Sequence, residues 1–181
     1  MVKLRSSNWT EVAYAGFDVE GVEEIHEEML RLAKTMVQRV DPQEARKELE
    51  EVMRSLSKYG PREVRFGTEV PKVEVKLSRA SALIIVLPPK HKLLAVETSK
   101  DMHHCLEWAA GAGKYPVLLY YSRRGVMTTT AYLYLGNVME DNNLGVLFVN
   151  GPPKEITEVL DLLERKGEYM PSENEVVDFR F

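Results

Sequence analysis

The chain has 181 residues, of which 44% are hydrophobic and 29% are charged. This composition excludes a disordered chain, and the length suits one domain of about 100 to 200 residues, or one domain with an appended helical piece. The longest apolar run, residues 82–87, falls far short of the ~20 residues that span a bilayer. The first residues lack a signal-peptide stretch, and the single Cys105 forms no internal disulfide. We therefore expect a soluble, cytoplasmic protein with no membrane partner.

Charge is distributed unevenly along the chain, although the net charge is only -4. Residues 61–124 contain eleven Lys and Arg against six Asp and Glu, whereas the segments before and after them are acidic. A solvated strand face explains such a bias, and an anion-binding surface is the alternative. The candidate anion-binding residues are Arg65, Lys72, Arg79, Lys90, Lys92, Arg123 and Arg124.

The N-terminal third is predicted to be helical. Residues 19–40 carry apolar side chains at a spacing of three and four, which predicts a helix with one apolar stripe. Asp41 and Pro42 then have the residue types of an N-cap and a first helical position, and Gly60 ends this second helix. The two helices predict an αα-hairpin over residues 1–60 that packs on an α/β sheet domain over residues 61–181. The stripes also suit contacts between chains, so we expect a protein partner or a homo-oligomer.

The remaining segments predict a mixed sheet with flanking helices. Alternating and continuous apolar patterns indicate strands, and stripes of three and four indicate helices. The expected fold class is α/β, with α+β as the alternative, and Cys105 is expected to be a buried structural thiol on the inward face of the first sheet-flanking helix. The predicted strands are 64–66, 73–77, 82–87, 93–96, 116–122, 128–135, 144–149 and 176–181; the predicted helices are 98–112 and 153–166, and residues 136–143 are predicted to be a loop.

The polar residues around Glu97 allow two interpretations. Glu97 follows the predicted strand 93–96, and His103 and Glu107 are four residues apart on the next helix, a spacing that suits two metal ligands. The alternative is structural. Thr98 and Asp101 would then form a capping box, and His103 and Glu107 a surface pair.

The predicted order helix, strand, strand, strand, helix, strand resembles the core of the PD-(D/E)xK nucleases. This resemblance of topology implies a divalent metal held by an acidic residue on one strand and an E-x-K pair on the next. Glu74 and Lys76 supply an E-x-K pair, but another strand follows it, and Glu69 precedes it in place of Asp. The strand before the helix offers Glu97, with Ser99 in the place of the lysine.

No motif identifies a reaction, so we weigh three hypotheses. The first is a non-catalytic binding or assembly subunit that engages a macromolecular partner through the basic middle strands, with nucleic acid as one candidate. The second is a metal-dependent hydrolase or nuclease that uses Glu97 with Glu74 and Lys76, or with His103 and Glu107. The third is a small-molecule enzyme with a pocket at the Glu97 strand end. A divalent metal is expected only if the chain is an enzyme.

Overall fold

The computed structural model describes residues 2–4, 18–19, 39–166 and 177–179, and its centre is a five-stranded sheet in the order β3-β4-β5-β6-β8. The pairs β3-β4 and β4-β5 are antiparallel, whereas β5-β6 and β6-β8 are parallel. The predicted α/β class with a mixed sheet is therefore confirmed. The strands are β3 (Arg62–Val64), β4 (Lys72–Lys76), β5 (Ala80–Val86), β6 (Tyr115–Ser122) and β8 (Gly145–Asn150).

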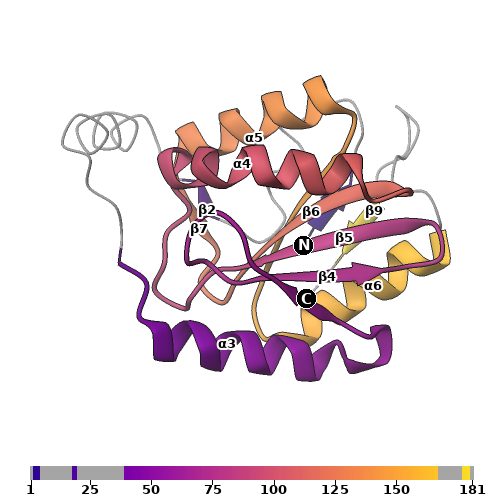
Figure 1. The fold of residues 1–181 in the computed structure, drawn as a ribbon, viewed down its shortest axis with the longest axis horizontal. Helices are drawn as coiled ribbons and strands as arrows, with labels where there is room; N and C mark the ends of the chain where they lie inside the picture. Colours follow the sequence, from indigo (N-terminus) through magenta and orange to yellow (C-terminus); the bar gives the residue numbers. More distant parts are fainter. Residues whose placement is uncertain (1, 5–17, 20–38, 167–176, 180–181) are drawn as a thin grey trace.

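Helices cover both faces of this sheet (Figure 1). On one face lie α4 (Ala95–Ala110) and α5 (Thr129–Asn142), which contact each other. On the other face lie α3 (Pro42–Ser55) and α6 (Lys154–Lys166), which also make contact. The sheet is thus the middle layer of three, and none of the helices in the described residues is long and apolar enough to cross a membrane.

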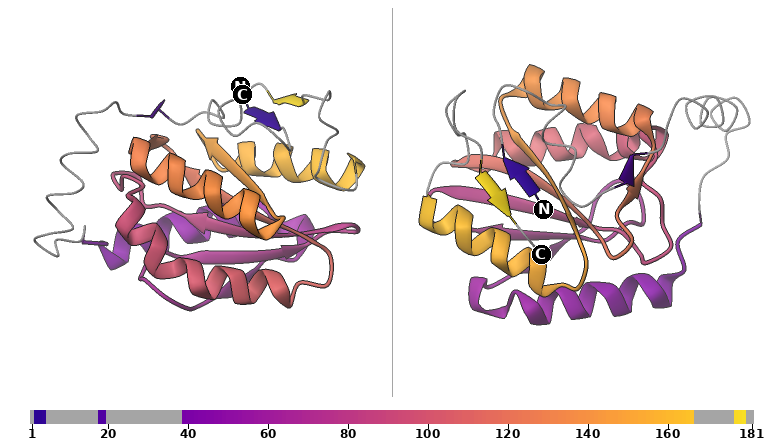
Figure 2. Two further views of the ribbon diagram at one scale, coloured as in Figure 1. Left: turned by 90° about the horizontal axis from the view of Figure 1, so that it is seen from above. Right: turned by 180° about the vertical axis from the view of Figure 1, so that it is seen from behind.

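Two small sheets join distant parts of the chain. Strand β1 (Val2–Leu4) pairs antiparallel with β9 (Val177–Phe179), and the two lie side by side in both views of Figure 2. Strand β2 (Asp18–Val19) pairs parallel with β7 (Val126–Met127). A terminal strand was predicted over residues 176–181, and β9 confirms it for the described part of that segment.

Helix α3 begins where the sequence predicts, but it ends at Ser55, before the predicted end at Gly60. The Asp41 side chain accepts hydrogen bonds from the backbone N–H groups of Gln43, at 2.9 Å, and Glu44, at 3.4 Å, and Pro42 occupies the first turn. After a short 3₁₀ turn, Gly60 adopts a left-handed φ of 60°, a conformation that glycine adopts without strain. The first predicted helix, over residues 19–40, lies largely outside the described residues; Val19 belongs to β2, and residues 39–40 are not helical.

The central strand is also as predicted. All seven residues of β5 are buried, and the strand lies between β4 and β6. A strand covered by helices on both faces of the sheet has no solvated side, so its sequence is continuously apolar instead of alternating.

The strand predicted over residues 93–96 is wrong. Leu93 forms only an isolated bridge to Met127, Leu94 is the N-cap of α4, and the helix begins at Ala95. A short apolar run does not distinguish a strand from the first turn of a buried helix. Glu97 therefore lies in the first turn of α4 and not at a strand end, and the predicted capping box of Thr98 and Asp101 does not form.

The strand predicted over residues 128–135 and the loop over 136–143 are wrong as well, because α5 spans this segment. The Thr128 hydroxyl accepts a hydrogen bond from the Ala131 N–H at 3.1 Å and so caps the helix. Buried Leu135, Val138 and Met139 follow at helical spacing. Packing against the sheet overrides the strand preference of the Thr and Tyr residues, which is weak and dependent on context.

Candidate functional site

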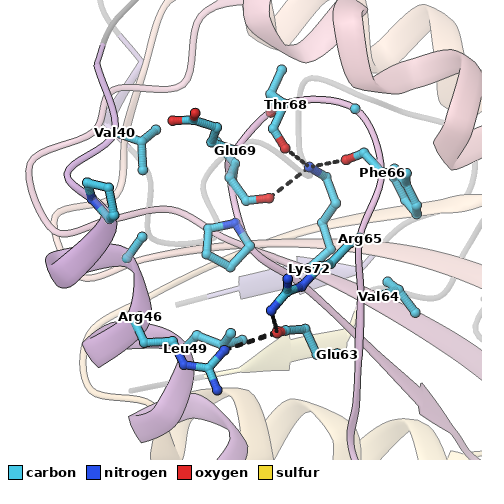
Figure 3. A pocket seen from close by; sticks show the side chains of 15 residues that line it. Val40, Arg46, Leu49, Glu63, Val64, Arg65, Phe66, Thr68, Glu69 and Lys72 are labelled. Carbon is cyan, nitrogen blue, oxygen red and sulfur yellow. Dashed lines mark hydrogen bonds and ion pairs between the residues drawn. The ribbon is translucent and has the colours of Figure 1, made fainter.

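A cleft of about 560 Å³ lies between α3 and the segment 63–72, which leads from β3 into β4 (Figure 3). Cavities of roughly 300 to 1,000 Å³ are typical of ligand sites. Most of its lining is apolar and comes from both sides of the cleft. The apolar lining residues are Val40, Pro42, Ala45, Leu49, Val64, Phe66, Val70 and Pro71.

Two arginines share one carboxylate at the rim of this cleft. Arg46 of α3 donates to both oxygens of Glu63 at 3.1 and 3.2 Å, and Arg65 donates to the same oxygens at 3.3 and 3.4 Å. The Arg46 and Arg65 side chains are 55% and 84% exposed. We call these three residues the arginine rim. Its guanidinium groups face solvent, so they are accessible to a ligand.

Residues 66–70 form a wall of the cleft, and the buried side chain of Lys72 holds this wall in place. The Lys72 side chain is only 1% exposed, and its ammonium group lies 3.1 Å from an Asp101 carboxylate oxygen. The same Nζ donates to the backbone carbonyl oxygens of Phe66, Thr68 and Val70 at 3.2, 3.3 and 2.8 Å (Figure 3). One buried cation therefore holds three carbonyl groups of this wall.

Asp101 of α4 holds the same wall through Thr68. It accepts a hydrogen bond from the Thr68 N–H at 2.6 Å and another from the Thr68 hydroxyl at 2.8 Å. Gly67 has φ +66°, and a Cβ at this position would lie 2.0 Å from a carboxylate oxygen of Asp101. Only glycine lets the wall approach the helix this closely. The cleft is therefore shaped before any ligand arrives.

Two polar residues of β4, Lys72 and Glu74, face α4 and not solvent. Lys72 meets Asp101, and two residues further along Glu74 accepts a hydrogen bond from the Trp108 indole N–H at 2.7 Å. Glu74 also accepts one from Arg62 at 2.9 Å. Burial opposes ionisation of Glu74, but the two hydrogen bonds, together with the charges of Arg62 and Lys76, lower its pKa. Glu74 thus stabilises the packing of α4 on β4, while Lys76 is exposed at the end of the strand.

The structure does not bring the three predicted catalytic residues together. Glu97 lies in the first turn of α4, eleven residues before Trp108, which binds Glu74. At 1.5 Å per residue, Glu97 and Trp108 are roughly 16 Å apart along the helix axis. Glu97 therefore lies at the other end of α4 from the helix residue that binds Glu74. Glu97 instead lies 3.3 Å from His91, and both side chains are buried.

The nuclease-like metal site has no counterpart at the matching strand positions. The described chain has the order α3-β3-β4-β5-α4-β6, but the strand predicted directly before the helix, residues 93–96, is not among its strands. Moreover, β4 begins with Lys72, its partner on β5 is Ile85, and β5 contains no carboxylate. At the start of β4, Lys72 instead forms an ion pair with Asp101 of α4.

His103 and Glu107 form the predicted surface pair, 2.9 Å apart and largely exposed. Across the described ranges, no group of three or more His, Cys, Asp and Glu residues is arranged to hold a metal ion.

The seven basic residues do not all share one surface. Lys72 is buried, and Arg123 forms ion pairs with Glu48 and Glu51 beside α3. Arg79 lies at the β4-β5 turn, whereas Lys90 and Lys92 follow the opposite end of β5, and Arg124 is exposed after β6. Of the seven, only Arg65 and Lys72 line the cleft.

Cys105 is fully buried, as predicted. Burial raises the pKa of its thiol to about 12. The group is therefore a protonated, unreactive thiol at neutral pH.

Sequence reasoning missed Thr68 and the structural role of Asp101, which shape the cleft, and His91, which pairs with Glu97. A usable signal was present. Asp101 is adjacent to Met102 and four residues before Cys105, so it lies on the inward side of α4. An acidic residue on an apolar helix face needs a buried cation as its partner.

Comparison of the chain with models of protein families, with curated proteins and with solved structures finds no match to any of them.

Proposed function

We propose that this protein is a non-catalytic binding subunit whose cleft between α3 and residues 63–72 receives a segment of a polypeptide partner. The observation that carries the proposal is the preformed cleft itself. Its lining is mainly apolar, its rim carries exposed arginines, and its wall is fixed by Lys72 and Asp101. A wall that is already ordered spares a ligand the entropic cost of ordering it.

The surroundings of the cleft favour a polypeptide over nucleic acid. Glu69 belongs to its lining and repels a phosphate backbone at its end of the cleft. Phe66 is the aromatic residue of the lining, and it already stacks on His104 with ring centroids 5.5 Å apart and lies 5.3 Å from the Lys72 ammonium group. Base stacking, which contributes much of the affinity of single-strand binders, is poorly served here.

Selection from a random peptide library displayed on phage tests the proposal with the full chain as bait. The comparison bait is Val64→Trp, which fills the cleft, and the matched control is Leu133→Trp, because Leu133 is 51% exposed on α5 outside the cleft. We expect peptides that bind the wild type and Leu133→Trp equally. They should bind Val64→Trp at least about tenfold more weakly, since a filled pocket excludes the anchoring side chain.

Peptides that bind all three baits equally would contradict the cleft as the site, and so would a selection that yields no peptide. Binding of a (dT)20 oligonucleotide that weakens steeply as salt rises, and that Val64→Trp abolishes, would instead assign the cleft to nucleic acid.

A second candidate is an acid–base site at the buried pair of His91 and Glu97, since a histidine beside a carboxylate is a common proton-transfer arrangement. The cavity next to this pair measures only about 10 Å³, which is room for about one water molecule. A metal-dependent form of this candidate is tested by the melting temperature in Mg²⁺, Mn²⁺ and Zn²⁺. A rise that Glu97→Gln abolishes supports it, and unchanged melting curves exclude a metal-dependent form.

A further inference from the structure

We infer that the partner segment carries an acidic residue next to the apolar residue that it inserts, and that Arg46 and Arg65 bind this carboxylate. The inference rests on the proposed function of the cleft and adds the chemistry of its ligand. It comes from the unused hydrogen-bonding capacity of the arginine rim and from the distribution of charge along the cleft.

The arginine rim has more donors than Glu63 occupies. Each guanidinium group offers five N–H donors. Within the described residues, Arg46 uses Nε toward Glu50 and NH1 toward Glu63, and Arg65 uses only NH2. The second terminal nitrogen of Arg46, and both Nε and NH1 of Arg65, are left for a ligand. A second carboxylate can therefore bind without displacing Glu63.

The existing rim contacts are also weak enough to rearrange. The Arg65 bonds to Glu63 are 3.3 and 3.4 Å long, and the Arg65 side chain is 84% exposed. Exposed ion pairs of this kind contribute little to stability, because solvent screens them. A ligand carboxylate that sits between two guanidinium forks gains charge-assisted hydrogen bonds at little cost to the rim.

Charge fixes where the carboxylate can lie. In Figure 3, Glu69 and Val40 lie at one end of the cleft, and Arg46, Glu63 and Arg65 lie at the other. Glu69 repels an anion at its own end, whereas the arginine rim attracts one. The apolar lining runs between the two ends, so the acidic residue of the segment adjoins its apolar anchor on the arginine side.

The test repeats the phage selection with the double variant Arg46→Gln and Arg65→Gln. The matched control is the double variant Lys47→Gln and Arg54→Gln. It also removes two positive charges from exposed residues, but these residues of α3 do not line the cleft. For wild type and control, we expect selected peptides in which Asp or Glu is enriched beside an apolar residue. For the double variant, we expect apolar enrichment without acidic enrichment. A selected acidic peptide should bind the double variant about tenfold more weakly, since its carboxylate loses charge-assisted hydrogen bonds.

The outcomes separate the inference from the proposed function. Cleft-dependent peptides whose acidic enrichment survives in the double variant would overturn the inference and leave the binding cleft intact. Peptides without acidic enrichment on the wild type would do the same. Failure to obtain any cleft-dependent peptide would overturn both. Melting curves of the two double variants within a few degrees of the wild type establish that the folded cleft is being compared.

Discussion

The cleft has charged residues on two sides, and the two sets differ in one property. Lys72 and Asp101 are buried behind the wall, whereas Arg46, Glu63 and Arg65 form an exposed rim. Removing charges from water costs several kcal/mol per ion, so a buried pair persists only when hydrogen bonds replace the water around it. Lys72 and Asp101 meet this condition with five hydrogen bonds to the wall. The rim faces no such demand and can exchange partners.

Burial, and not residue type, therefore decides what a charged residue does at this cleft. The buried pair fixes the shape of the cleft, whereas the rim carries charged groups that are exposed to solvent. The following substitutions test whether the buried and the exposed residues differ in this way, and they are ordered by the expected change in the free energy of unfolding.

Lys72→Met removes the buried cation and leaves the Asp101 carboxylate without its ionic partner. We expect the free energy of unfolding to fall by about 3 to 5 kcal/mol, as for other broken buried pairs. Urea denaturation measures the change. The control is Lys76→Met on the same strand, an exposed position at which about 0.5 kcal/mol or less is expected. Equal losses for the two variants would mean that burial gives Lys72 no special role.

Gly67→Ala tests the close approach of the wall to α4. The new Cβ would lie 2.0 Å from Asp101, in a backbone conformation with φ +66°, so we expect a loss of about 2 to 4 kcal/mol in the free energy of unfolding. Gly60→Ala is the matched control, because Gly60 has φ +60° and open space around it. Its expected loss is about 1 kcal/mol. If the two variants lose the same amount, the contact with Asp101 does not constrain the wall.

Cys105 reports on the packing of α4 behind the cleft. Burial raises the pKa of its thiol to about 12 from 9.0. Above pH 9 the unfolded chain loses this proton while the folded chain keeps it, so folding stability falls as pH rises from 9 toward 12, by at most about 1.4 kcal/mol per pH unit. Urea titrations of the wild type and Cys105→Ala between pH 8 and 11 measure this slope. The variant should show a shallower decline, and parallel curves would mean that the thiol is not held in a buried site.

Arg65→Gln has the smallest expected effect on stability. The side chain is 84% exposed, so the free energy of unfolding should change by about 0.5 kcal/mol or less. Urea denaturation provides the measurement. A loss above about 2 kcal/mol, of the size expected for buried charges, would remove the distinction between the rim and the buried pair.

The elements that local signals specify were predictable from the sequence. The cap at Asp41 and Pro42 gave the start of α3, and the continuous apolar run gave β5. The errors in α5 and at Glu97 arose where the sheet decides between helix and strand, because local preference is a weak term against burial.

The cleft was not predictable for a related reason. Lys72 and Asp101 are far apart in the chain, and in the sequence Lys72 looks like one more solvated charge on an alternating strand. Only the packing of α4 on β4 reveals that it is buried. Charge counting along the sequence therefore grouped Lys72 with exposed residues such as Arg65, although Lys72 is buried behind the wall and Arg65 is exposed at the rim.

Backbone amide chemical shifts of the ¹⁵N-labelled full chain, titrated with an acidic peptide from the phage selection, test the central claim most directly. We expect the largest shifts on residues 43–49 and 63–70, which line the cleft or adjoin its lining. In the double variant Arg46→Gln and Arg65→Gln, saturation should require about ten times more peptide. Shifts concentrated on α5 or around His91 and Glu97, with residues 43–49 and 63–70 unchanged, would contradict the cleft as the binding site.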